Sequence, residues 1–113
     1  MTFDSYCVAL LTLSVDPPSL SAQEAAELQD SHMAHLADLH DAGLLLVAGP
    51  LEDVHYRGLM ILKTNAESAR RLLDDDPAVR AGRFEVTVVP WMVPGGLLTF
   101  TPSKLPRSIS EIG

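Results

Sequence analysis

The order of the apolar segments constrains the fold of this chain more than any other feature of its sequence. Strand-like runs alternate with segments whose apolar residues recur at helical spacing, in the order strand, helix, strand, strand, helix, strand. This order is typical of the split βαβ arrangement, and it predicts an α+β, ferredoxin-like βαββαβ domain with one four-stranded antiparallel sheet. The expected elements are 3–13, 21–42, 44–51, 57–64, 65–75 and 84–92.

Local signals mark the ends of the predicted helices. Ser21 and Glu24 have the spacing of a capping box, so the first helix should begin near Ser21, and Gly43 supplies the left-handed residue that ends it. Pro77 ends or restarts the second helix, because proline has no amide hydrogen to donate to the helix. Proline and glycine recur after residue 93. We therefore predict a domain over residues 1–93 and a C-terminal arm or tail over residues 94–113.

One face of the predicted sheet lacks a cover within the chain. Right-handed crossovers place both helices on the same face. The first and last strands are nevertheless apolar on both faces, and Glu85 is the only charged residue in the last one. We therefore expect a homodimer in which a second subunit covers the open face. A cleft between the sheet, the first helix and the partner subunit is the natural place for a small-molecule substrate.

The charge of the chain excludes two classes of partner. Its 113 residues carry 15 acidic and 8 basic side chains, a net charge of −7. Nucleic acids and anionic membranes are bound mainly through Lys and Arg, so we expect neither as a partner. The longest apolar stretch, 43–50, is far shorter than the roughly 20 residues of a membrane-spanning helix. With no leader-like N-terminus, a cytoplasmic location is expected.

The sequence offers little to hold a metal or a cofactor. A single cysteine, Cys7, lies in an apolar strand-like run and is expected to be a buried core residue. His32 and His35 are too few ligands for a metal site, and no glycine-rich phosphate loop or Gly-x-Ser-x-Gly elbow is present. We expect no metal and no cofactor. His55, in a polar loop, should be exposed to solvent.

Two histidines of the first helix are candidates for proton transfer. On a helical wheel, His35 falls in the apolar stripe and His32 lies on the same side one turn earlier. An imidazole oriented by a carboxylate is well suited to proton transfer near neutral pH, although a core histidine can also be purely structural. Asp76 is the candidate carboxylate, because Pro77 disfavours helical geometry at Asp76 and frees its side chain from the helix surface.

Three segments carry a resemblance to a known family. They are 35–39 (HLADL) followed by 43–50 (GLLLVAGP), then 76–82 (DPAVRAG), then 86–91 (VTVVPW). Over about residues 3–93 the chain resembles the YciI-like (YCII-related) proteins of the dimeric α+β barrel superfamily. The resemblance implies a subunit that dimerises through its sheet, with His35 and Asp76 as a catalytic dyad. Many relatives carry an arginine three residues before the histidine. Here that position is His32, so an anionic substrate would lose an anchor.

These observations favour a small cofactor-independent lyase or isomerase acting on a small cyclic or aromatic metabolite. His35 would shuttle the proton and Asp76 would orient the imidazole. We expect His32, Gly49, Pro50 and Trp91 to contact the substrate, although Trp91 is also a natural core or interface anchor. Two alternatives stay open. One is a non-catalytic dimer that binds a metabolite or assists assembly, and the other is a cofactor-free oxygenase or cyclase.

Overall fold

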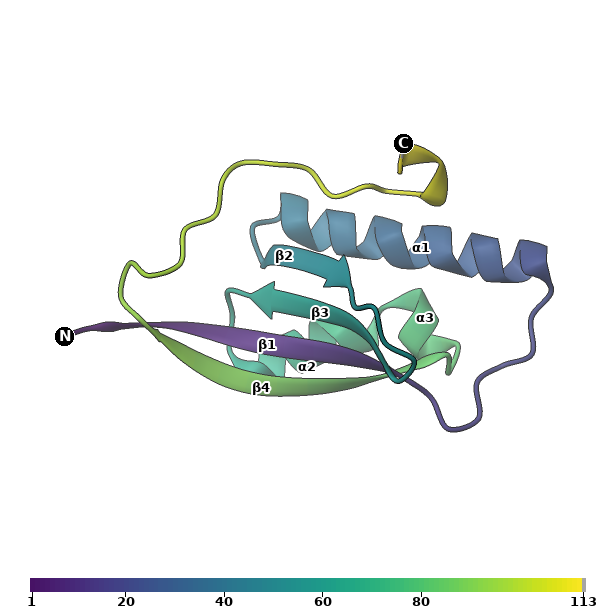
Figure 1. Ribbon diagram of the computed structural model, residues 1–113, viewed down its shortest axis with the longest axis horizontal. Helices are drawn as coiled ribbons and strands as arrows, with labels where there is room; N and C mark the ends of the chain where they lie inside the picture. The colour runs from purple at the N-terminus through teal and green to yellow at the C-terminus, as the bar shows by residue number, and fades with distance from the viewer. Residues whose placement is uncertain (113) are drawn as a thin grey trace.

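The protein folds as the predicted α+β, ferredoxin-like domain. The computed structural model describes residues 1–112, so Gly113 of the predicted tail lies outside the described part. The four strands form one antiparallel sheet in the order β2-β3-β1-β4 (Figure 1). None of the helices in residues 1–112 is long and apolar enough to cross a membrane. The elements are β1 (Phe3–Leu13), α1 (Ala22–Asp41), β2 (Leu45–Pro50), β3 (Tyr56–Leu62), α2 (Ala66–Asp74), α3 (Pro77–Arg80), β4 (Phe84–Pro94) and the 3₁₀ helix η1 (Ile109–Glu111).

The predicted signals at the helix ends are confirmed. The Ser21 hydroxyl accepts a hydrogen bond from the Glu24 amide at 3.1 Å, and the Glu24 carboxylate accepts one from the Ser21 amide at 3.0 Å. Hydrogen bonding to the Glu24 carboxylate, first from the Ser21 amide and then from the Ser21 side chain, holds the pKa of this carboxyl below its usual value. Gly43 has the left-handed φ of +78° expected after a helix. Pro77 restarts the helix rather than simply ending it, because α3 begins there.

Helices α1 and α2 both contribute to one hydrophobic core on one face of the sheet. Alternate residues of β1, namely Cys7, Ala9 and Leu11, are buried there against Leu39 of α1 and Leu73 of α2. The Cys7 thiol donates a hydrogen bond to the Thr64 carbonyl at 3.1 Å, and burial raises the pKa of this thiol. Cys7 is therefore the buried core residue that the sequence predicted.

The opposite face of the sheet is apolar and partly exposed. Tyr6, Val8 and Leu10 of β1 are half-buried, and Val89 and Trp91 of β4 are 49% and 39% exposed. The Trp91 ring lies beside that of Tyr6, with centroids 6.4 Å apart. Within a single chain, β1 and β4 are thus well buried on one face only, because the helices cover only that face.

The segment after β4 turns back along α1 and is held there (Figure 1). The Arg107 guanidinium contacts Asp38 at 2.7 Å and Asp41 at 3.6 Å. Its hydrogen bond to Asp38, and then the attraction between the two charges, raise the pKa of Arg107. The Ile109 amide donates to the Asp30 carboxylate at 2.8 Å. The tail is therefore an arm that packs on α1 of its own chain.

Candidate functional site

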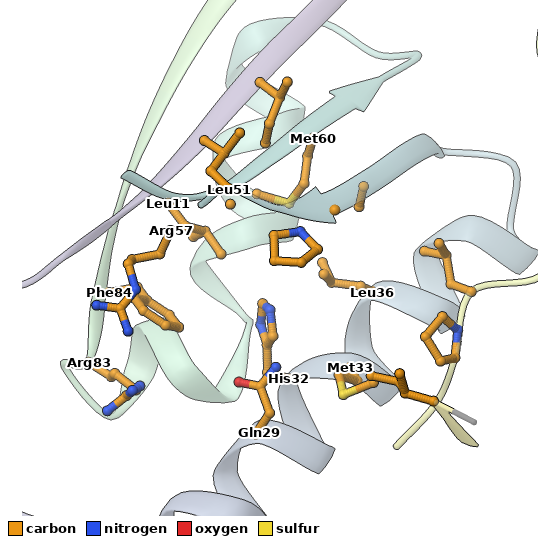
Figure 2. Close-up of a pocket in the computed structure, with 18 residues that line it drawn as sticks. Leu11, Gln29, His32, Met33, Leu36, Leu51, Arg57, Met60, Arg83 and Phe84 are labelled. Atoms are coloured by element: carbon orange, nitrogen blue, oxygen red, sulfur yellow. The ribbon is translucent and has the colours of Figure 1, made fainter. Parts of the chain in front are cut away.

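A cavity of about 330 Å³ lies between α1 and the sheet. Its walls come from α1, from β2 and β3, and from the start of β4. Most of the lining side chains are apolar, such as Met33, Leu36 and Met60 (Figure 2). The tail closes part of the cavity with Leu105, Pro106 and Ile112. The sheet and the first helix thus form two of the predicted boundaries of the cavity. The tail of the same chain forms a third.

His32 projects from α1 toward the middle of this cavity (Figure 2). Its residue exposure is 8%, and its Nδ1–H donates a hydrogen bond to Oδ2 of Asp76 at 2.5 Å. The Phe84 ring lies to one side of the imidazole, with 6.0 Å between the ring centroids. His32 is therefore a largely buried imidazole held by a carboxylate.

Asp76 is completely buried, and its position follows from the break between α2 and α3. Its extended backbone (φ −60°, ψ 127°) places it as the N-cap of α3, with Pro77 as the first helical residue. Oδ1 accepts a hydrogen bond from the Ala78 amide at 2.9 Å, while Oδ2 accepts one from His32. Both carboxylate oxygens are thus satisfied, so the side chain is fixed in one orientation.

The predicted pairing of His35 with Asp76 is wrong, and His32 takes its place. The Nε2–H of His35 donates to the Leu72 carbonyl of α2 at 2.8 Å. A helical wheel gives the direction of a side chain around the axis, but two residues on the same side still differ by one turn along it. The start of α3 lies level with His32. The residue three positions before this histidine is therefore Gln29, which also lines the cavity.

The hydrogen bond to Asp76 determines which nitrogen of His32 is available for chemistry. With the hydrogen on Nδ1, the lone pair of the neutral ring lies on Nε2. Nothing in residues 1–112 is hydrogen-bonded to Nε2, and His32 lines the cavity. Nε2 can therefore accept a proton from a bound molecule, and Asp76 can stabilise the resulting imidazolium.

The other two histidines have no such arrangement. In His40 both nitrogens face carbonyl oxygens, Nδ1 that of Leu45 at 2.7 Å and Nε2 that of Ser103 at 3.0 Å. His40 thus links the end of α1 to the tail. His55 is exposed, as predicted, and its ring meets that of Tyr56 edge-on at 4.8 Å.

The cavity contains three of the four expected substrate contacts. Gly49 and Pro50 of β2 line it together with His32. Trp91 does not line it, because its strand position points to the opposite face of the sheet, beside Tyr6. Within residues 1–112, no group of three or more His, Cys, Asp or Glu side chains could hold a metal ion.

Two charged residues of the cavity were not predicted from the sequence. Arg57, at the start of β3, and Arg83, just before β4, both line the cavity. Strands β3 and β4 are each antiparallel to β1, so they run in the same direction and begin at the same end of the sheet. Basic residues at the starts of these two predicted strands were the signal that could have identified the pair.

Comparison with known proteins places the candidate site inside a recognised domain. Residues 9–92 match the YCII-related domain, a stretch that contains His32, Asp76, Arg57 and Arg83 and ends before the tail. No curated protein matches the sequence. Since the matched stretch makes up most of the chain, the protein belongs to the YCII-related domain family.

Proposed function

We propose that the protein is a cofactor-independent lyase or isomerase in which His32 transfers a proton to or from a small cyclic or aromatic metabolite. One observation carries the proposal: a buried imidazole, oriented by Asp76, turns its free nitrogen into an apolar cavity. The cavity volume of about 330 Å³ lies at the small end of ligand pockets, which span roughly 300–1,000 Å³. A ring-sized molecule suits that volume.

The proposed reaction begins when Nε2 of His32 removes a proton from a carbon of the substrate. The imidazolium that forms lies against the Asp76 carboxylate, which stabilises the charge. His32 then returns the proton to another atom, giving an isomer, or to a leaving group, giving an elimination product. Positioned acid–base catalysis contributes about 10²- to 10⁴-fold. That contribution suits double-bond migration, dehydration or dehydrohalogenation of an activated substrate.

A proton-transfer assay can test the proposal before the physiological substrate is known. We would incubate the full chain in D₂O with a panel of small cyclic ketones, lactones and hydroxylated aromatic acids. Deuterium incorporation and product formation would be followed by NMR and mass spectrometry. We expect activity on at least one compound, and a loss of about 10²-fold or more in His32→Gln. His35→Gln is the matched control, because it alters a histidine on the same helix outside the cavity lining.

The activity of His32→Gln decides between a catalytic and a structural role for His32. Equal activity in His32→Gln and the wild type would overturn the catalytic role. The His32–Asp76 pair would then serve to hold α3 and the cavity wall, as the metabolite-binding alternative requires. Product formation that stops when oxygen is removed would instead favour the cofactor-free oxygenase.

We further propose that the protein is a homodimer in which the open sheet face forms the interface. The support is the apolar character of this face, which includes Leu59, Val89 and Trp91 at 37%, 49% and 39% exposure. Analytical ultracentrifugation should give a dimer for the wild type and a monomer for Val89→Asp. Val54→Asp, in a loop at 83% exposure, is the control and should remain dimeric. A monomeric wild type would contradict the proposal.

A further inference from the structure

We infer that Arg57 and Arg83 bind the carboxylate of the substrate, so that the substrate is a small apolar acid. The inference rests on the proposed function and adds the chemical class of the molecule that the cavity takes. It starts from an imbalance of charge: the chain is acidic, yet two guanidinium groups line the same apolar cavity as His32.

The two arginines lie on one side of the cavity. In Figure 2 both appear on the side of Phe84, and Met33 and Leu36 lie across the cavity beyond His32. Both arginines are half-buried. The cavity thus has a cationic side and an apolar side, with the free nitrogen of His32 between them.

Neither guanidinium has a carboxylate partner in the part of the chain that the structure describes. The ion pairs within 4.0 Å there join His32 to Asp76 and Arg107 to two aspartates of α1. Arg57 donates one hydrogen bond, to the Val54 carbonyl at 3.2 Å. Arg83 places its guanidinium carbon 5.3 Å from the centroid of the Phe84 ring. Most of the N–H donors of both groups thus stay free, although the chain has 15 acidic residues that could pair with them.

The geometry of a guanidinium matches that of a carboxylate. Its planar set of N–H donors can make two parallel hydrogen bonds to the two oxygens. Partial burial strengthens this attraction, because surrounding water screens the charges less. A carboxylate on the cationic side would leave the ring of the acid among the apolar side chains and a ring or side-chain carbon near Nε2 of His32.

A binding experiment with benzoate tests the inference, using benzamide as a neutral molecule of nearly the same shape. We would titrate each into the full chain by calorimetry at low ionic strength. We expect benzoate to bind about tenfold more tightly than benzamide, and added salt to weaken benzoate binding alone. Arg57→Gln and Arg83→Gln should each weaken benzoate binding about tenfold and leave benzamide binding unchanged.

Two further variants show whether the loss of benzoate binding is specific to the cavity and to the guanidinium group. Arg80→Gln removes an exposed arginine that does not line the cavity, and it should bind benzoate like the wild type. Arg57→Lys keeps the charge without the planar donors, so its affinity for benzoate should fall between those of the wild type and Arg57→Gln. Unfolding midpoints of all variants would show that each is folded.

Three results would overturn the inference: equal affinity for benzoate and benzamide, no binding of benzoate, or equal losses in Arg80→Gln and Arg57→Gln. None of them depends on turnover. They therefore leave the deuterium test of His32 intact. Conversely, a failed His32 test would leave arginine-dependent benzoate binding as evidence for an acid-binding protein without proton transfer.

Discussion

Successive turns of α1 carry the same residue type in different surroundings. His32 donates to the buried carboxylate of Asp76 and turns its other nitrogen to the cavity. About one turn further along, His35 donates to the Leu72 carbonyl, and near the end of α1 both nitrogens of His40 face carbonyl oxygens. A carboxylate can stabilise an imidazolium, whereas a neutral carbonyl mainly holds the ring in place. The acceptor, not the residue type, therefore separates a candidate base from a structural histidine.

The turn that carries His32 and the turns that carry His35 and His40 also differ in what removal of the acceptor would do. Asp76 is a side chain that can be substituted, and it serves His32 and α3 together. Leu72 and Leu45 act through backbone carbonyls, which substitution leaves in place. Mutation can thus separate the two kinds of histidine.

The largest expected effect is on the stability of Asp76→Ala. This change removes the cap of α3 and leaves the buried Nδ1–H of His32 without an acceptor. We expect the free energy of unfolding to fall by about 2–4 kcal/mol, measured by urea denaturation. Asp74→Ala, at an exposed aspartate of the same segment, is the matched control. A loss no greater than that of the control would mean that the Asp76 contacts contribute little.

The next effect is on the tautomer of His32 in Asp76→Asn. The amide keeps an oxygen for the Ala78 cap, but it presents N–H groups to Nδ1, so the ring should turn its hydrogen to Nε2. Activity should then fall by roughly 10²- to 10⁴-fold with little loss of stability. Imidazole ¹⁵N NMR should show hydrogen on Nδ1 of His32 and on Nε2 of His35 in the wild type. Only the tautomer of His32 should change in the variant. A change in His35 as well would contradict the assignment of Asp76 to His32 alone.

A smaller effect is expected for His35→Ala. The change removes the hydrogen bond to the Leu72 carbonyl between α1 and α2. We expect a loss of about 1 kcal/mol in the free energy of unfolding, with turnover nearly unchanged. Denaturation and the deuterium assay measure both. A large loss of turnover in a stable His35→Ala protein would reassign the base.

Arg107→Gln tests whether the contact between the tail and α1 helps close the cavity. The variant loses the exposed ion pairs with Asp38 and Asp41. We expect global stability to stay close to that of the wild type, because exposed ion pairs contribute little. The Ile109 amide, which is bonded to Asp30, should exchange its hydrogen faster. Unchanged exchange in this variant would show that other contacts hold the tail.

The smallest effect concerns pH and the capping box at the start of α1. The pKa of Glu24 is lower in the folded chain than its ordinary value of 4.5, so its contribution is present above that value. The contribution is lost as the pH falls through the lower folded pKa. The stability difference between the wild type and Glu24→Gln should therefore shrink on acidification. The His32 tautomer at neutral pH should be the same in both, because the cap lies more than a turn away.

Much of the fold was predictable because its signals are local. The Ser21–Glu24 cap, the glycine at the end of α1 and the proline after Asp76 each act within a few residues. The direction of His32 toward the core, and the freedom of Asp76 to leave the helix surface, were predictable on the same grounds. The pairing of His35 with Asp76 failed because it required a distance along α1 that no local signal contains.

The sequence by itself determined the order of the elements, the ends of the helices and the two residue types of the His–Asp pair. Those properties depend on hydrophobic periodicity and on short-range hydrogen bonding. Only the tertiary structure decided that His32 meets Asp76, that Arg57 and Arg83 converge on one cavity, and that the tail closes part of it. These contacts join segments that are far apart in the chain. They depend on how far each helix and strand is shifted along its neighbours, which is settled by packing of the whole domain.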